Sequence, residues 1–210
     1  MVCIAATLLL AAGSGPAAAQ PLPVAGRDYL LLDPPRPAAP GQTIEVIEFF
    51  YYGCPVCYES QPHIARWLAA AGADVSLTRV PTAFAAESEN FALTYYALES
   101  SGLLEQLHGP VYENHHFDDR RLHEERNLLD WLGRNGVDAE AFRLLRNSAG
   151  NRERMAAGRA LFDAYGVRGV PSFAVDGRFV TSARLAGGVR EMMDVVAYLV
   201  DRAREERRKR

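Results

Sequence analysis

The sequence has little net charge, few cysteines and no internal repeat or low-complexity tract, and each shortage narrows the range of functions. A formal net charge of −3 at pH 7 gives no electrostatic reason to expect binding to nucleic acid or to an anionic membrane. Three cysteines cannot supply a second Cys-x-x-Cys, so a four-thiolate metal site is excluded. The apolar stretch at residues 2–12 is too short to span a bilayer as a helix.

What the chain does contain is enough apolar material for a folded protein. Hydrophobic residues make up 49% of its 210 residues, which is enough to bury a sizeable core and is not the composition of a disordered or fibrous protein. The length suits one domain, or one domain that carries an insertion.

Residues 1–19 have the features of a secretory signal peptide. The apolar residues 2–12 are followed by glycine, serine and proline and then by three alanines, which predicts cleavage after Ala19. No lysine or arginine precedes the apolar stretch, which departs from the usual basic start of such a signal. We therefore expect an exported protein. Its mature chain keeps only Cys54 and Cys57, because Cys3 lies in the segment that is removed.

The motif Cys54-Pro55-Val56-Cys57 is the most informative feature of the chain. It follows an apolar run at residues 44–53, which predicts a buried strand leading into a helix. At a helix N-terminus, unpaired backbone N–H groups and the helix dipole favour a thiolate, so the first cysteine is expected to be reactive. A disulfide between residues three apart closes too small a loop to stabilise a fold much. In an oxidising compartment the pair can rest as a disulfide, and its partners are then the thiols of other proteins.

The pattern around this motif predicts a strand, a helix and a second strand. β-Branched and aromatic residues are dense at residues 43–52, and the alternation at residues 75–80 is typical of a strand. Between them, apolar residues recur at helical spacing from Cys54 to Gly72. Pro62 is expected to kink this helix and to separate a short first turn from a longer second piece. Such a unit is right-handed, with parallel strands.

The middle of the chain shows only helical patterns, in five segments near residues 91–98, 103–112, 122–132, 139–145 and 152–165. After them, Asp176-Gly177 lies between two strand-like runs, which predicts a two-residue hairpin turn. A last helix is expected from about residue 189 to residue 204, and the residues that follow Tyr29 can add a short leader strand. A block of helices therefore interrupts a chain that otherwise builds one sheet.

This order of elements, together with three short motifs, resembles the DsbA family of periplasmic thiol:disulfide oxidoreductases. The motifs are Glu48-Phe49-Phe50, the segment at residues 53–58 that contains both cysteines, and Gly169-Val170-Pro171 before the hairpin. The resemblance covers nearly all of the mature chain. It implies an α/β protein with a thioredoxin fold and an inserted all-helical domain. Residues 20–85 and 166–210 then form the thioredoxin-like domain, and residues 86–165 form the insert.

The resemblance implies an enzyme that donates its Cys54–Cys57 disulfide to thiols of newly exported proteins. In the implied mechanism a substrate thiolate attacks Cys54, and Cys57 is the leaving group. The implied location is the periplasm. The implied partners are reduced, unfolded or partly folded secreted proteins, together with a membrane quinone reductase of the DsbB type that reoxidises the enzyme. No cofactor, metal or nucleic acid is expected, and the chain is expected to act as a monomer.

The residues beside the cysteines are expected to tune this chemistry. Pro55 and Val56 stand between them, and Val56 departs from the family's usual Cys-Pro-His-Cys. Valine can neither donate a side-chain hydrogen bond to the thiolate nor carry a charge, so we expect a weaker oxidant than the usual family member.

The resemblance also implies a cis bond between Val170 and Pro171, in a loop against the Cys54 sulfur, with the Val170 backbone free to pair with a substrate. An ordinary trans proline that opens a strand is the alternative.

Glu48 is the remaining candidate site residue. It matches the acidic residue that the family has beneath the active site, and Arg79 on the next strand stands where the family has a basic partner. Glu48 can accept or return the proton of Cys57 through water, or it can form a structural ion pair that has no catalytic role. The sequence leaves both roles open.

Three classes of function stay open from the sequence. The first is a dithiol oxidase, favoured because no amino-terminal dimerisation domain precedes the thioredoxin unit. The second is a disulfide isomerase or reductase of the same fold, or a specialised DsbA paralogue of weaker oxidising power, which Val56 favours. The third is a non-catalytic module whose cysteines bind metal or only cross-link the chain. It is disfavoured because the five histidines are expected at the surface or in loops and complete no site with Cys54 and Cys57.

Overall fold

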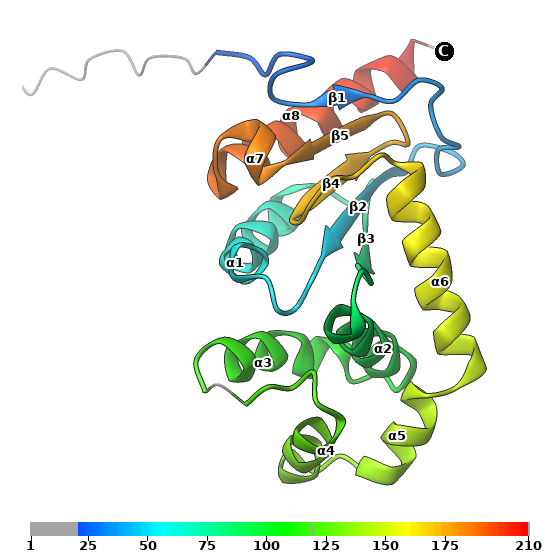
Figure 1. Ribbon diagram of the computed structural model, residues 1–210. Helices are drawn as coiled ribbons and strands as arrows, with labels where there is room; N and C mark the ends of the chain where they lie inside the picture. The colour runs from blue at the N-terminus through cyan, green and yellow to red at the C-terminus, as the bar shows by residue number, and fades with distance from the viewer. Residues whose placement is uncertain (1–20, 119, 210) are drawn as a thin grey trace, which may run out of the picture.

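The computed structural model describes residues 21–118 and 120–209 of the chain. The signal peptide expected at residues 1–19, and Cys3 within it, lie outside the described residues. The described part consists of one five-stranded sheet covered by helices, and of a group of helices that extends from one end of it (Figure 1).

The sheet mixes parallel and antiparallel pairs in the order β1-β5-β4-β2-β3. Its strands are β1 (Leu30–Leu31), β2 (Ile44–Phe50), β3 (Val75–Pro81), β4 (Ser172–Val175) and β5 (Phe179–Ser182). β2 and β3 are parallel, whereas β2 with β4, β4 with β5 and β1 with β5 are antiparallel. The predicted strand–helix–strand unit is therefore confirmed, with the helix α1 (Pro55–Ala70) as its connection.

Between β3 and β4 the described chain forms helices only, as the sequence predicts. They are α2 (Ala86–Ser100), α3 (Leu104–His116), α4 (Glu125–Arg134), α5 (Ala139–Arg146) and α6 (Ala149–Ala164). After β5 come the short helix α7 (Ala183–Ala186), which the sequence pattern misses, and the last helix α8 (Val189–Arg208), which runs beyond its expected end. Figure 1 shows α2 to α5 grouped away from β1 and β5, with α6 leading back to the sheet.

β2 is buried along almost its whole length because helices cover both faces of the sheet beside it. On one face, Ile64 of α1 and Val196 of α8 join Val46 in one hydrophobic cluster. On the other face, Phe162 of α6 packs edge-on against Phe49, with ring centroids 5.8 Å apart. A strand covered on both faces has no solvent-facing side, which explains why its sequence is nearly continuous in apolar residues.

The turn between β4 and β5 is formed by Asp176 and Gly177. Both have positive φ angles, 54° and 66°, which is the left-handed geometry of a two-residue hairpin turn. Gly177 is needed for a second reason, since a Cβ at this position would lie 2.5 Å from the carbonyl oxygen of Arg36. The hairpin that Asp-Gly predicts is confirmed.

Helix α1 runs from Pro55 to Ala70 and contains Pro62, so the predicted helix on both sides of this proline is confirmed, and the kink expected there stays a prediction. Proline removes one backbone hydrogen-bond donor from the helix interior. Two residues later, however, the completely buried Ile64 packs into the cluster between the sheet and α8. This packing stabilises α1 on the C-terminal side of the proline.

An aromatic cluster joins the sheet to the group of helices. Phe50, at the end of β2, packs edge-on against Tyr95 of α2 with ring centroids 5.2 Å apart. Tyr52 packs in the same way against Tyr112 of α3 at 4.8 Å. Phe50, Tyr52 and Tyr112 are fully buried. The helices therefore pack directly onto the chain segment that leads from β2 to Cys54.

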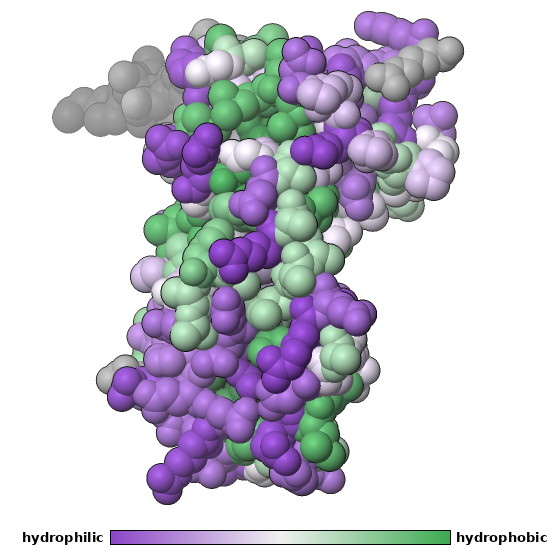
Figure 2. Space-filling model, turned by 45° about the vertical axis from the view of Figure 1, so that its right-hand side comes forward, coloured by the Kyte–Doolittle hydropathy of each residue, from purple (hydrophilic) through white to green (hydrophobic). Residues whose placement is uncertain are grey.

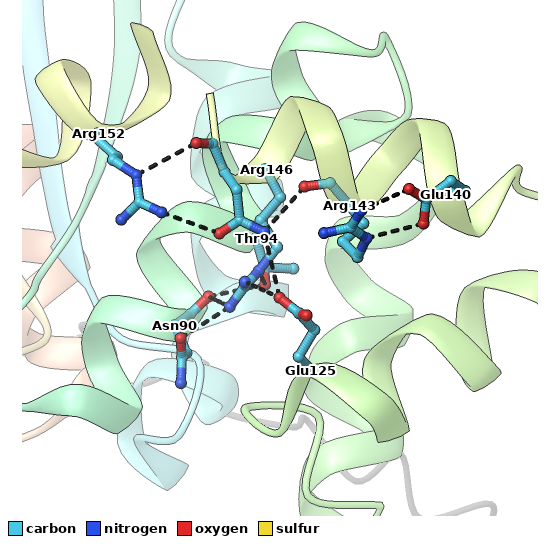
Figure 3. Close-up of polar contacts among 8 residues, drawn as sticks. Asn90, Thr94, Glu125, Glu140, Arg143, Arg146 and Arg152 are labelled. Atoms are coloured by element: carbon cyan, nitrogen blue, oxygen red, sulfur yellow. Dashed lines mark hydrogen bonds and ion pairs between the residues drawn. The ribbon is translucent and has the colours of Figure 1, made fainter. Parts of the chain in front are cut away.

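Within the group of helices, the side chain of Arg146 in α5 links α2 and α4 (Figure 3). Its guanidinium donates to Thr94 Oγ1 at 3.3 Å and to Asn90 Oδ1 at 3.0 Å, and it lies 3.0 Å from a carboxylate oxygen of Glu125. Only 3% of the side chain is exposed, and burial lowers the pKa of Arg146. A buried charge is tolerated only where it is paired, so this contact specifies how the three helices meet.

The surface differs between the two parts of the molecule. On the face drawn in Figure 2, hydrophilic residues cover most of the helical group, and hydrophobic residues gather toward the sheet. Among the described residues, no helix combines the length and the apolar character needed to cross a membrane.

Candidate active site

Cys54 caps the N-terminus of α1. Its backbone is extended (φ −89°, ψ 116°), and its Sγ accepts a hydrogen bond from the Cys57 backbone N–H at 3.4 Å. Pro55 follows at the start of the helix, where a backbone N–H would have no helical partner in any case. Both cysteines are free thiols, but Cys54 is partly exposed and Cys57 is completely buried. Only the sulfur of Cys54 is open to a thiolate from another protein.

The two thiols have opposite acid–base character. The side-chain hydrogen bond with Cys57, supported by the backbone N–H groups of Cys57 and Val56, lowers the pKa of Cys54 to about 6 despite the effect of burial. Burial raises the pKa of Cys57, and the hydrogen bond with Cys54 and its charge raise it further. At neutral pH the reduced pair therefore holds one proton, on Cys57, and one negative charge, on Cys54.

Val56 lies beside the reactive sulfur and is 39% exposed. Its backbone N–H helps to stabilise the Cys54 thiolate, but its side chain has no group that can donate a hydrogen bond. The surface next to Cys54 is therefore apolar at the position between Pro55 and Cys57.

The loop before β4 lies against Cys54. The Val170–Pro171 peptide bond is cis, as the resemblance implies, and the Val170 carbonyl oxygen lies 3.8 Å from Cys54 Sγ. Among the described residues, the only hydrogen bond to this carbonyl oxygen is the weak one that the Cys54 thiol donates. The structure thus brings Cys54 and the Val170–Pro171 pair together from positions that are far apart in the sequence.

A hollow with a volume of about 200 Å³ lies next to this loop. Its lining includes Val167, Val170, Pro171 and Leu185, together with Leu30 of β1, so it is mainly apolar. The hollow adjoins the backbone that faces Cys54, and it can take an apolar side chain of a segment bound there.

Glu48 is completely buried in β2, opposite Arg79 in the register with β3. Arg79 Nε lies 3.0 Å from one carboxylate oxygen, and Gln61 Nε2 donates to the other at 3.1 Å. The same amide of Gln61 donates to the carbonyl oxygen of Cys57 at 3.1 Å. Burial raises the pKa of Glu48, while Arg79 and Gln61 act in the opposite direction. The carboxyl group and the buried cysteine are therefore joined through one shared amide.

His108 of α3 extends this polar network into the helical group. Its Nε2 lies 3.3 Å from Gln61 Oε1, and its Nδ1 lies 2.7 Å from the Tyr52 hydroxyl. Burial, and then the positive charge of Arg79, lower the pKa of His108 to about 3. The ring is therefore neutral at physiological pH, with one nitrogen that donates a hydrogen bond and one that accepts.

The expectation that the histidines lie at the surface or in loops is confirmed only in part, because His123 lies in the loop between α3 and α4 but the other four lie in helices. None of the five is exposed, and His108, His115 and His116 belong to α3. His116 Nε2 lies 2.8 Å from the carbonyl oxygen of Tyr52, and its ring stacks on Tyr58 with centroids 5.6 Å apart. His108 and His116 are eight residues apart, which places them on one helix face. That spacing is the sequence signal that identifies them, but only the fold shows that this face meets the segment before Cys54.

Comparisons with known proteins agree with this geometry. Residues 61–193 match the model of the DSBA-like thioredoxin domain. The chain is 33% identical over 206 residues to the thiol:disulfide interchange protein DsbA of Pseudomonas aeruginosa, covering 98% of both chains. It is 31% identical to the DsbA of Azotobacter vinelandii, covering 96% of this chain and 94% of the relative.

Solved structures are similar as well. The crystal structure of Pseudomonas aeruginosa DsbA superimposes with a TM-score of 0.82 at 33% identity, covering 88% of this chain and 96% of that chain. The oxidoreductase DsbA from Xylella fastidiosa gives a TM-score of 0.80 at 29% identity, covering 88% of this chain and 99% of that chain. The similarity therefore extends over both the sheet and the group of helices.

The low pKa of Cys54 predicts how its reactivity depends on pH. In the reduced protein, the rate of alkylation of Cys54 by iodoacetamide should rise with pH through a midpoint of about 6 and then level off. In Cys57→Ala the thiol donor is lost, and the midpoint should rise by about one to two pH units, since a hydrogen bond to a charged group contributes roughly 1.5–3 kcal/mol.

Cys57→Ser is the matched control, because a hydroxyl keeps a donor at this position. Its midpoint should stay closer to that of the unsubstituted protein. A midpoint near the value of an ordinary thiol in the unsubstituted protein, or the same midpoint in all three proteins, contradicts the assignment.

Proposed function

Since the chain belongs to the DsbA family of thiol:disulfide interchange proteins, we propose that it forms disulfide bonds in exported proteins by donating its own Cys54–Cys57 disulfide. As a member of this family it is a protein-disulfide oxidoreductase. The observation that carries the proposal is the contrast between an accessible thiol whose pKa is lowered to about 6 and a buried thiol whose pKa is raised.

The reaction follows from this contrast. A substrate thiolate attacks Sγ of Cys54, a new S–S bond forms, the Cys54–Cys57 bond breaks, and Cys57 leaves as a thiolate that takes up a proton. A second thiolate of the substrate then attacks the substrate sulfur of the mixed disulfide and expels the Cys54 thiolate. Two electrons pass from the substrate dithiol to the enzyme, which ends with both cysteines reduced.

The lowered pKa of Cys54 drives this reaction toward oxidation of the substrate. Because the folded-state pKa lies near 6, below the ordinary value of 9.0, the thiolate stabilises the folded reduced protein fully above pH 9 and ceases to do so as the pH falls through about 6. The oxidised protein carries no thiolate and gains nothing from these hydrogen bonds. The reduced state is therefore favoured at neutral pH, which makes the disulfide an oxidant.

In this proposal the substrates of the enzyme are reduced, unfolded or partly folded secreted proteins in the periplasm. Such chains share no sequence, so their recognition has to rest on backbone and on nonspecific apolar contact. The Val170 backbone beside Cys54 can pair with an extended segment, and the apolar hollow next to Pro171 can take one of its side chains. Pro55 and Val56 complete the surface that the segment meets.

The proposal also covers the enzyme's cycle and organisation. The reduced enzyme is reoxidised by a membrane quinone reductase of the DsbB type, and the enzyme acts as a monomer.

The thioredoxin-like domain of this proposal consists of residues 20–85 and 166–210, and residues 86–165 form the inserted helical domain. The helices α2 to α6 between β3 and β4 support this division.

Val56 favours a second candidate within the same family, a specialised enzyme of weaker oxidising power or a reductase or isomerase. The thiolate of Cys54 receives hydrogen bonds from the backbone and from Cys57, but the side chain at position 56 adds none. The reduction potential decides between these candidates, because a reductase requires a potential well below the glutathione poise of the compartment.

A trapping experiment tests the proposed function. In Cys57→Ala the Cys54 thiolate can attack a disulfide of another protein, which forms a mixed disulfide and expels the other sulfur of that disulfide as a thiolate. No Cys57 thiol remains to resolve the product, so Cys54 should accumulate in mixed disulfides with exported proteins and with the reoxidising membrane protein when the variant is produced in cells. These complexes are resolved on non-reducing gels and identified by mass spectrometry. The double variant Cys54→Ala/Cys57→Ala is the control and should capture nothing. Equal capture by both variants, or none by Cys57→Ala, contradicts the proposal.

The proton role of Glu48 predicts slower exchange in Glu48→Gln. General acid–base catalysis contributes roughly 10²–10⁴-fold where contact is direct, and we expect at least about tenfold here, where water carries the proton. The measurement is the stopped-flow rate of oxidation of a reduced peptide as a function of pH. Arg79→Gln is the control, because it breaks the same ion pair but keeps the carboxyl group. If both variants react at the unsubstituted rate, Glu48 has only the structural role.

The substitution Val56→His should make the protein more oxidising. One charge-assisted hydrogen bond to the Cys54 thiolate is worth about 1–2 kcal/mol, which corresponds to roughly 20–40 mV for a two-electron couple. The potential is measured by equilibration with glutathione. Val56→Ala is the matched control and should leave the potential nearly unchanged. A potential of Val56→His equal to that of the unsubstituted protein means that position 56 does not tune the couple.

A further inference from the structure

Three side chains with metal-binding groups meet beside the active site. Glu87 at the start of α2, His115 near the end of α3 and His123 between α3 and α4 each place one ligand atom within 4.8 Å of the other two. Among the described residues, no other group of three His, Cys, Asp or Glu side chains comes as close. The cluster includes neither cysteine and plays no part in the thiol chemistry described above.

The imidazole rings are held in place by packing. Both His115 and His123 pack edge-on against Phe91, with ring centroids 4.9 and 5.9 Å away, and their own centroids lie 5.8 Å apart. Both histidines are half-buried. Their ring positions are therefore set by the fold, which limits the entropy lost when such groups ligate an ion.

The orientation of His123 points to ligation. Its buried Nδ1 makes no hydrogen bond in the described part of the protein, and it faces Glu87 Oε1 at 3.9 Å. That separation is too long for a hydrogen bond. Ligand atoms about 2.1 Å from a tetrahedral zinc ion lie about 3.4 Å from each other, so a small side-chain rotation brings both atoms to one ion.

Glu87 retains ligand capacity although it already has a partner. The Tyr51 hydroxyl donates a hydrogen bond to Glu87 Oε1 at 2.5 Å. A carboxylate has about four lone-pair sites on its two oxygens, so this hydrogen bond leaves room for a metal ion. The hydrogen bond also supports the ligation, since it orients the carboxylate from outside.

We propose that Glu87, His115 and His123 bind one divalent transition-metal ion of the zinc type. Two imidazoles and one carboxylate are ligands that suit zinc, and a set of three protein ligands leaves a further coordination position for water or another ligand. The ion links α2, α3 and the segment before α4.

The site adjoins the redox centre through Tyr51. The Tyr51 ring lies so close to Gly53 that a Cβ on this glycine would overlap it, and Gly53 immediately precedes Cys54. The Tyr51 carbonyl also accepts the Cys54 backbone N–H at 3.0 Å. An ion on Glu87 therefore sits one hydrogen bond away from the segment that positions the reactive sulfur.

The test is calorimetric titration of the oxidised mature protein, residues 20–210, with zinc chloride. Oxidation is essential, because the disulfide removes both thiols as ligands. We expect one zinc ion to bind per chain. In Glu87→Gln and in His123→Gln the affinity should fall at least about tenfold, since even the loss of a residue that only orients a ligand weakens metal binding roughly 10- to 100-fold. His63→Gln, in α1 and outside the cluster, is the matched control and should bind as the unsubstituted protein does.

Thermal unfolding of the same oxidised proteins gives a second measurement. Zinc should raise the unfolding midpoint of the unsubstituted protein and of His63→Gln, because an ion that binds only the folded state stabilises it. At the same zinc concentration it should raise the midpoint of Glu87→Gln by less, because that variant binds zinc more weakly. Glu87→Gln keeps the acceptor for Tyr51 and the side-chain volume, so it is expected to fold. Absence of binding, or binding that Glu87→Gln and His123→Gln leave intact, overturns the proposal.

Discussion

The active site depends on the hydrogen bonds that the first turn of α1 directs at Sγ of Cys54. The backbone N–H groups of Val56 and Cys57 and the thiol of Cys57 all favour the thiolate, against a burial that opposes it. This arrangement exists because α1 begins directly after Cys54, shortly after the end of β2 at Phe50, so that the sulfur occupies the capping position. Two elements hold that position. Strand β2, covered by helices on both faces, precedes Cys54, and the packed helix α1 follows it.

The helical group is a structural part of the site. Tyr52, which precedes Cys54, is held by His108 through its hydroxyl and by His116 through its carbonyl. On the far side of the cysteines, the ring of His116 stacks on Tyr58. Below them, Gln61 connects His108 with Glu48 and with the carbonyl of Cys57. One face of α3 thus fixes the chain on both sides of the reactive sulfur.

Local patterns predicted much of this architecture. The apolar run of β2, the Asp176-Gly177 turn and the helical periodicities act over a few residues, so each could be assigned without knowledge of the fold. Ile64 shows the limit of such reasoning, because it anchors α1 through contacts with β2 and α8 that no local pattern contains. The histidines show the same limit, because their spacing on α3 indicates a shared face but not what that face meets.

The sequence by itself determined the reactive pair and its helix-capping setting, because Cys54 and Cys57 are one helical turn apart directly after a strand. It also determined the family, since short motifs and element order are properties of the chain as written. The tertiary structure alone decided which groups surround the sulfur. Val170 approaches Cys54 across 116 positions of sequence, and Glu87, His115 and His123 meet at the junction of three elements. Contacts between residues so far apart in the sequence depend on how helices and strands pack, and packing is a property of the whole chain.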